Sequence, residues 1–205
     1  MLGTSSRPAY GKFDQPSTVS LCERTGDSGC RFIVGDQEAN YRRRMTAVVP
    51  QPGRVSVLLV CSPGGHLQQL ATLRHVWDDY SRAWVTLDKS DARSMLEGER
   101  IVFARGPTER NLGNLARNLV LAASVIRELR PAVIITTGAA LAVPFVWVGR
   151  LYRARIVFIE SMSRITKPSL ALRLSAPALD RIYVQWPELR SAVRDSRFVG
   201  SLLSS

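Results

Sequence analysis

The stretch VSVLLVCSPGGHL, residues 55–67, decides the fold class. Its first seven residues are apolar apart from Ser56, as expected of a central strand that helices cover on both faces. Two glycines and the beginning of an amphipathic segment follow directly. A strand that runs through a glycine turn into a helix is a typical unit of a parallel α/β sheet.

The chain after Val55 repeats this alternation of short apolar runs and longer amphipathic stretches. It predicts an α/β fold with a doubly wound, mostly parallel, Rossmann-like sheet of six or seven strands. Strands are expected at 55–61, 83–87, 101–104, 132–136, 155–159, 181–184 and 198–199, and helices at 67–80, 91–96, 112–129 and 141–152. Ligands are then expected outside the carboxyl ends of the strands.

Two of the predicted helices are apolar enough to raise the question of membrane contact. Ala132–Gly149 carries no charge over eighteen residues, which is the length of a short membrane span. Gly138 and Pro144 favour a strand followed by a helix instead. A monotopic contact with lipid, through the helix at 141–152 or the amphipathic helix at 112–129, remains open.

Residues 1–54 differ in kind from the rest, with scattered Pro, Gly and Ser, an Arg triplet at 42–44 and no sustained periodicity. We expect a mostly disordered basic extension here and a Rossmann-like domain at 55–205. Three cysteines without metal-site spacing, and no apolar leader in the first thirty residues, favour a reducing, cytosolic environment. No cluster of metal ligands is visible.

The formal net charge is +11, and 25 of the 28 basic residues are arginines. Guanidinium groups bind phosphates bidentately, so the charge suits nucleic acid, anionic lipid or a phosphorylated substrate. Aromatic residues are few, at 7%, and do not interleave with the basic ones as base-stacking platforms would. We therefore expect no nucleic-acid partner.

Three strand ends carry residues suited to chemistry. Ser62, Gly64, Gly65 and His66 follow the first strand, where backbone N–H groups and the helix dipole converge on an anion. The positive end of the dipole also favours the neutral imidazole that a general base needs. A capping histidine without chemistry is the alternative.

The other two strand ends are Thr136-Thr137-Gly138 and Glu160-Ser161-Met162-Ser163-Arg164. The first is either a second loop of the same crevice or a tight turn. In the second, Arg164 suits a diphosphate, and Glu160 suits a sugar hydroxyl or the orientation of His66. The alternative is an ion pair between Glu160 and Arg164.

Taken in order, these motifs resemble a known family. They are Cys61-Ser62-Pro63-Gly64-Gly65-His66-Leu67, Thr137-Gly138, Glu160-Ser161-Met162-Ser163-Arg164 with Pro168-Ser169, Gln185-Trp186-Pro187-Glu188-Leu189 and Phe198-Val199-Gly200. They are similar to the family of the acceptor-side subunit of the dolichol-pathway N-acetylglucosaminyltransferase, whose bacterial members include PssD- and CpsF-type exopolysaccharide proteins. The resemblance covers about residues 55–200.

The resemblance implies the N-terminal half of a split GT-B glycosyltransferase, similar in plan to MurG. Such a half binds a polyprenyl-diphosphate-sugar acceptor at the cytoplasmic face of the membrane, peripherally in this case. It recruits a smaller subunit that binds the UDP-sugar donor, and neither a metal nor another cofactor is expected. Eukaryotic members usually begin with a membrane-spanning helix, and this sequence shows none, so the mode of attachment stays open.

Carried over by position, the resemblance assigns three groups of residues. The expected catalytic residues are His66 and Glu160. Those expected at the acceptor diphosphate are Ser62, Gly64, Gly65, Gly138, Ser161 and Arg164, and those at the partner interface or interdomain cleft are Gln185, Trp186 and Glu188. The competing hypothesis is a non-catalytic adaptor that only anchors and stabilises a partner.

Overall fold

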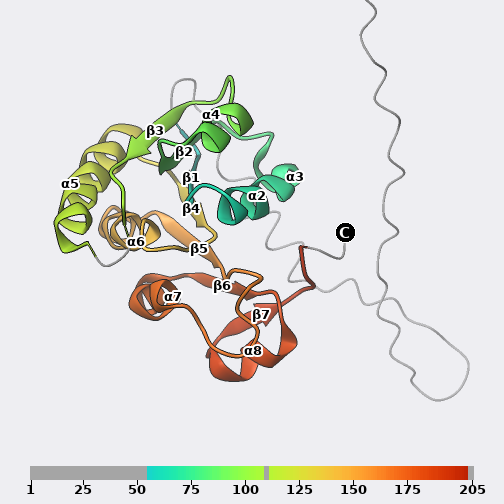
Figure 1. Cartoon of the computed structure of the whole chain (residues 1–205). Helices are drawn as coiled ribbons and strands as arrows, with labels where there is room; N and C mark the ends of the chain where they lie inside the picture. Colours follow the sequence, from blue (N-terminus) through green and yellow to red (C-terminus); the bar gives the residue numbers. More distant parts are fainter. Residues whose placement is uncertain (1–54, 109–110, 203–205) are drawn as a thin grey trace, which may run out of the picture. The chain divides into compact units, whose positions relative to one another are not determined.

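A computed structural model describes residues 55–108 and 111–202 of the chain (Figure 1). Its seven strands form one sheet in the order β3-β2-β1-β4-β5-β6-β7, and every pair is parallel. They are β1 Val57–Val60, β2 Arg82–Leu87, β3 Ile101–Ala104, β4 Val133–Thr136, β5 Arg155–Ile159, β6 Arg181–Val184 and β7 Ser196–Phe198. The predicted fold class and strand number are confirmed.

The strand order reverses between β1 and β4, because the chain first adds β2 and β3 on one side and then crosses over. All four residues of β1 are buried, and so are those of β4. Both strands read as continuous apolar runs because helices cover both faces of the sheet. The loops after β1 and β4 therefore meet at the switch point where open α/β sheets bind ligands.

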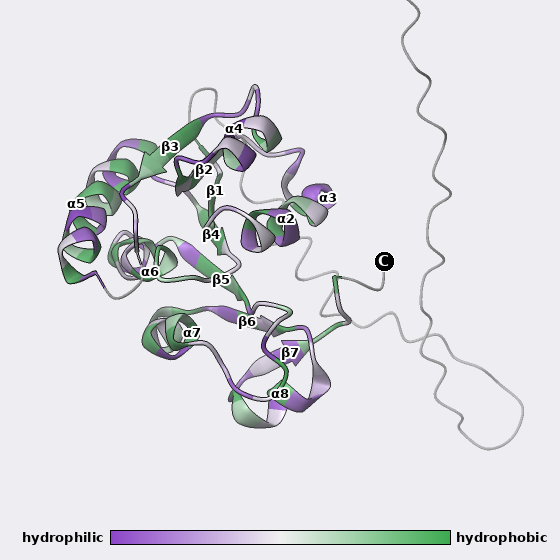
Figure 2. Ribbon diagram, viewed as in Figure 1, coloured by the Kyte–Doolittle hydropathy of each residue, from purple (hydrophilic) through white to green (hydrophobic). Residues whose placement is uncertain are grey.

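The helices divide between the two faces of the sheet. They are α2 Gly65–Thr72, α3 Arg74–Trp77, α4 Ser90–Met95, α5 Leu112–Leu129, α6 Ala142–Leu151, α7 Leu170–Ser175 and α8 Pro187–Ala192, with a 3₁₀ turn at Ala176–Ala178. One core cluster packs α2, α3 and α4 against Leu59 and Ile135, and another packs α5 and α6 against Leu58 and Ile134. Figure 2 shows the resulting pattern, with mostly hydrophobic strands and helices of mixed hydropathy.

The prediction of a single helix at 67–80 is wrong in detail, because α2 ends at Thr72 and α3 begins at Arg74. At the break, the Leu73 N–H donates to the Leu70 carbonyl at 3.2 Å, one residue closer than in an α-helix. The break lets Trp77 turn inward, where its indole N–H also reaches the Leu70 carbonyl and its ring meets Trp84 edge-on at 5.2 Å. Burial of this aromatic pair is the physical reason for the break.

Helix α5 was predicted from its apolar periodicity, and its second half buries apolar residues as far as Leu129, but in its first turns the buried side is not the leucine side. Over the first turns the structure buries Asn114 and Asn118 and leaves Leu112 81% exposed and Leu119 47% exposed. The Asn118 amide accepts from the Arg105 N–H and donates to the Arg105 carbonyl, both at 2.9 Å. These two hydrogen bonds hold the asparagine side of the helix against the preceding loop, so that Leu112 and Leu119 point outward.

The uncharged stretch 132–149 forms β4 and α6, as Gly138 and Pro144 predicted. Within residues 55–108 and 111–202, no helix is both long and apolar enough to cross a bilayer. The basic extension predicted at 1–54 lies outside the residues that the structure describes. The predicted strand at 198–199 is displaced slightly, since β7 occupies Ser196–Phe198.

Candidate functional site

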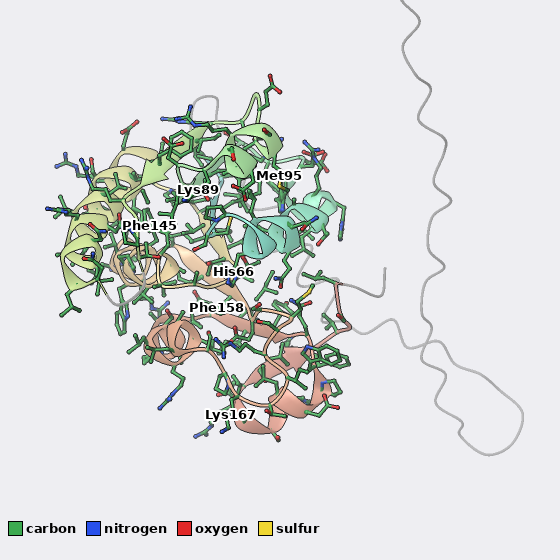
Figure 3. All side chains as sticks on the ribbon, viewed as in Figure 1. His66, Lys89, Met95, Phe145, Phe158 and Lys167 are labelled. Atoms are coloured by element: carbon green, nitrogen blue, oxygen red, sulfur yellow. The ribbon has the colours of Figure 1, made fainter. Side chains whose placement is uncertain are left out.

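The predicted site residues gather at the carboxyl edge of the sheet, in the loops that follow β1, β4, β5 and β6. These four strands are consecutive neighbours, so their loops lie side by side. Figure 3 labels His66, in the first turn of α2 after the β1 loop, and Phe158, in β5 just before the third of these loops. Most positions selected from the sequence are thereby brought together.

His66 is tied to the second loop by two reciprocal hydrogen bonds. Its ring Nδ1 lies 2.9 Å from the Thr137 carbonyl oxygen, and the Thr137 hydroxyl donates to the His66 carbonyl at 2.9 Å. A carbonyl oxygen only accepts, so Nδ1 carries the proton. In the neutral ring, Nε2 is then the nitrogen with the free lone pair, as a general base requires.

Burial lowers the pKa of His66 below its usual value, because the partly buried ring is less able to hold a charge. The hydrogen bond to Thr137 and the negative charge of Glu160 oppose this, and the positive charge of Arg164 adds to it. The balance favours the neutral imidazole. Both Glu160 and Arg164 are thus close enough to His66 to act on it electrostatically.

Gly138 was expected at the diphosphate, but the structure gives it a different place. It is buried, and its N–H donates to the Thr136 hydroxyl at 3.0 Å, so that this amide is already used. Its φ of +98° is strained for any residue with a side chain, and a Cβ here would meet the Phe158 ring at 3.1 Å. The glycine instead lets Phe158 and His66 approach the turn.

Gly64 was also assigned to the diphosphate, and its amide is already occupied too. Its N–H donates to the Asp91 carboxylate at 2.7 Å, across from the beginning of α4. Sequence reasoning missed Asp91, because a carboxylate twenty-seven positions away gives no local signal. A carboxylate bonded at this turn shows that the glycine loop accepts an anionic oxygen.

The amides that remain for a ligand are those of the first turn of α2. In the part of the chain that the structure describes, the N–H groups of Gly65, His66 and Leu67 have no hydrogen-bond acceptor. They belong to the N-terminal groups that a helix cannot satisfy internally. Gly65 is exposed and Ser62 half-buried beside it, so both predicted residues stay accessible.

Glu160 was expected to be catalytic, by orienting a sugar hydroxyl or His66, and the structure buries its carboxylate. The residue is 1% exposed. One carboxylate oxygen accepts from the Ser161 N–H and the other from the Ser169 N–H, both at 2.9 Å. No hydrogen bond joins Glu160 to His66, and no ion pair joins it to Arg164. Its carboxylate closes the loop between β5 and α7.

Ser161 and Arg164 lie in this closed loop, with different exposure. Ser161 is buried, and its hydroxyl lies 3.0 Å from that of Ser163, which makes it part of the loop rather than an open ligand group. Arg164 is exposed, and its N–H donates to the Ser161 carbonyl at 3.0 Å. Among the predicted diphosphate residues, Arg164 is the cation within electrostatic reach of His66.

The three residues expected at a partner interface or cleft separate into different environments. Gln185 is 3% exposed and bonds internally, so it does not present a contact surface. Trp186 is half-buried, and its indole N–H donates to the Met162 carbonyl at 2.6 Å. Glu188 is exposed in the first turn of α8 and stays available to a partner.

Gln69 is a residue that the sequence analysis did not select. It is 7% exposed in α2 and bonds to both Met162 and Gln185. A polar residue three positions after His66 in an amphipathic stretch reads as surface, so only the packing shows its place. Within residues 55–108 and 111–202, no three His, Cys, Asp or Glu side chains gather in a way that would hold a metal ion.

Comparison with known proteins shows what this chain is similar to. The family model described as "Oligosaccharide biosynthesis protein Alg14 like" matches residues 111–202. This match covers less than half of the chain. Relatives named UDP-N-acetylglucosamine transferase subunit ALG14 from Candida albicans and Eremothecium gossypii are 26% and 27% identical to it. These matches cover 75% and 72% of this chain and 80% of each relative. The resemblance found in the motifs is confirmed.

Solved structures support the fold of this chain. MurG from Acinetobacter baumannii matches with a TM-score of 0.57 at 12% identity, over 70% of this chain and 45% of that protein. UDP-N-acetylglucosamine 2-epimerase from Rickettsia bellii matches with a TM-score of 0.58 at 11% identity, over 74% and 46%. The chain thus spans less than half the length of these GT-B-type proteins, and the likeness concerns the Rossmann-like fold.

Proposed function

We propose that this protein is the acceptor-side subunit of a split, UDP-sugar-dependent glycosyltransferase. It binds a polyprenyl-diphosphate-sugar at the cytoplasmic face of a membrane and recruits a smaller subunit that holds the donor. The product belongs to lipid-linked oligosaccharide or exopolysaccharide biosynthesis. The observation that carries the proposal is His66, whose Nδ1 is held by Thr137 so that Nε2 keeps its lone pair, in a chain whose relatives are named as transferase subunits.

In the proposed reaction, this chain accepts one proton. The hydroxyl of the acceptor sugar attacks the anomeric carbon of the donor, a carbon–oxygen bond forms, and the bond to the UDP phosphate breaks with its electron pair leaving on UDP. His66 Nε2 takes the hydroxyl proton as the new bond forms. The hydrogen bond from Nδ1–H to Thr137 then stabilises the imidazolium.

The acceptor diphosphate is bound by groups that have no other use. The three N–H groups of Gly65, His66 and Leu67 converge at the positive end of α2. Arg164 adds a guanidinium from the opposite loop, and the half-buried Ser62 precedes the glycines in the same loop. The loops are shaped by Gly64 and by the buried residues Gly138, Ser161 and Glu160.

Membrane contact is assigned to an apolar stripe on α5. Its exposed residues are Leu112, Leu115, Leu119 and Val120. Helix α5 packs on α6, and α6 on α7, where Trp147, Leu151, Leu170 and Leu174 are also exposed. Exposed arginines on the same three helices, Arg117, Arg127, Arg150 and Arg173, suit anionic head groups. Because α5 follows the carboxyl end of β3, it begins at the same end of the strands as the proposed acceptor site.

Replacing Leu112 and Leu119 together by Glu is expected to weaken binding to vesicles of phosphatidylglycerol and phosphatidylethanolamine by at least about tenfold, since one leucine buried in an apolar phase is worth about 1.5 kcal/mol or more. Vesicle co-sedimentation of the purified chain measures this. Met95→Glu is the matched control, because Met95 is similarly exposed but lies on α4 at the other face. Equal binding by the α5 variant and the wild type would remove the stripe from the proposal.

Co-purification and turnover test the function as a whole. The full chain, tagged and extracted from membranes in mild detergent, is expected to bring a smaller donor-binding polypeptide with it. The complex should transfer N-acetylglucosamine from UDP-N-acetylglucosamine to a short-chain polyprenyl-diphosphate-sugar. Recovery of the chain alone, with no transfer after addition of both substrates, would contradict the proposal.

Arg164→Ala in this complex is expected to raise KM for the lipid acceptor by about tenfold, the size of one lost charge-assisted hydrogen bond. KM for the UDP-sugar should stay unchanged, because the donor is bound by the partner. Arg190→Ala, which removes an exposed arginine from α8, serves as the control for net charge. An unchanged acceptor KM in the Arg164 variant would exclude this guanidinium from the acceptor site.

A further inference from the structure

We propose that Gln69 is a positioning residue for acceptor binding, because it fixes the loop that carries Arg164. The proposal rests on the function proposed above and extends its site by one residue. Gln69 lies in α2 one turn beyond His66 and is buried beneath the loop between β5 and α7. It therefore connects the helix of the proposed base to the loop of the proposed phosphate-binding cation.

The side-chain amide of Gln69 makes three hydrogen bonds that use both of its ends. Its Nε2 donates to the Gly65 carbonyl at 3.0 Å. Its Oε1 accepts from the Met162 N–H at 3.1 Å and from the Gln185 side chain at 2.8 Å. The carbonyl of Gly65 only accepts and the N–H of Met162 only donates, so this arrangement permits one orientation of the amide.

Met162 is held from the other side as well. Its carbonyl accepts from the Trp186 indole N–H at 2.6 Å. Both polar backbone groups of Met162 are thus bound by side chains, one from α2 and one from the loop after β6. Arg164 lies two residues further along the same turn, which closes through the bond from its N–H to the Ser161 carbonyl. The two hydrogen bonds to the Met162 backbone fix the turn that carries the Arg164 guanidinium.

Gln185 holds Gln69 in place. Its Nε2 donates to the Glu160 carbonyl at 3.0 Å in addition to the Gln69 oxygen, and its Oε1 accepts from the Leu202 N–H at 3.2 Å. The pair of amides is buried and internally satisfied, which makes it rigid. Loss of the Gln69 oxygen leaves the Met162 N–H and one side-chain N–H of Gln185 without an acceptor. The loop between β5 and α7 is then held less rigidly.

The kinetic consequence follows from the part of the acceptor that Arg164 binds. The acceptor diphosphate keeps its bonds during transfer, so a contact with it is equally strong before and in the transition state. Weakening such a contact raises KM and leaves kcat unchanged. A residue that acts through Arg164 must show the same pattern, whereas a general loss of folded protein lowers the apparent kcat.

The test compares Gln69→Met with the wild type in the purified complex, since Met fills a similar volume without the amide. We expect the acceptor KM to rise about tenfold, as for one lost hydrogen bond to a positioned group, with kcat changed less than about twofold. Ser196→Ala is the matched control. It removes another buried side-chain hydrogen bond to a backbone carbonyl, at the beginning of β7 and so away from the carboxyl ends of the strands, and should leave the acceptor KM unchanged.

A double-mutant cycle with Arg164→Ala decides whether Gln69 acts through that arginine. In the Arg164→Ala background, Gln69→Met should add little to the acceptor KM. Fully additive losses, or a Gln69→Met variant that behaves like Ser196→Ala, would overturn the proposal while leaving the function intact. A wild-type complex without transfer, or an Arg164→Ala variant with an unchanged KM, would overturn the proposed function or its diphosphate site.

Discussion

His66→Ala is expected to lower kcat of the complex by at least about a hundredfold, the lower range for loss of a positioned general base. The reason is geometric, because Thr137 fixes the Nδ1 proton and leaves Nε2 as the proton acceptor. Transfer of radiolabelled N-acetylglucosamine to the lipid acceptor measures the change. Binding of the acceptor should weaken far less, since the backbone N–H groups of α2 remain.

His75→Ala is the matched control for this variant. His75 is the other histidine in the chain and is exposed on α3. It should have wild-type kcat, and both variants should unfold at similar temperatures. Near-normal turnover by His66→Ala would remove the residue from the chemistry and favour the non-catalytic adaptor, in which the partner holds every reacting group.

The pH dependence follows from the same residue. Burial holds the pKa of His66 below the usual 6.5, and the ring accepts a proton only in its neutral form. We therefore expect kcat/KM to fall as the pH drops through this lowered pKa, with the midpoint of the acid limb below 6.5. In His66→Ala this acid limb should be absent from the residual activity.

Glu160→Gln is the second variant with a large expected effect. The carboxylate accepts one backbone N–H with each oxygen, whereas a glutamine must point an NH₂ group at one of them. Hydrogen bonds to a charged group contribute about 1.5–3 kcal/mol each. We expect the free energy of unfolding to fall by about 2 kcal/mol and kcat/KM for the acceptor by about thirtyfold.

Chemical denaturation and acceptor titration separate these two effects. Glu188→Gln is the control, since Glu188 is exposed and the change in charge is the same. A Glu160→Gln variant with native stability but no turnover would show that the carboxylate takes part in the chemistry, as the sequence first indicated. A native free energy of unfolding together with a native kcat/KM would exclude both a structural and a catalytic role for the carboxylate.

The fold was accessible from sequence because its signals are local. Continuous apolar runs such as Val57–Val60 mark buried parallel strands, and their spacing predicts the crossover helices. The burial of the first turns of α5 was not accessible, since the apolar periodicity predicts that the leucines there face the core. Asn114 and Asn118 decide it by bonding to the loop before the helix, and that contact exists only once the chain has folded.

The candidate site was predictable by position and less so by role. Strand ends are identified by sequence, so His66, Glu160 and Arg164 were placed at the right edge of the sheet. Whether Glu160 faces a ligand or the loop beneath depends on which backbone N–H groups it meets. Gln69 and Asp91 were missed for the same reason, because their partners lie far away in sequence.

The most direct test of the acceptor-side assignment is a pair of titrations of the full chain without its partner. In detergent, the chain should bind a short-chain polyprenyl-diphosphate-N-acetylglucosamine saturably, and Arg164→Ala should weaken this binding. UDP-N-acetylglucosamine should show no saturable binding over the same range. Tight binding of the UDP-sugar without any binding of the lipid diphosphate would contradict the assignment.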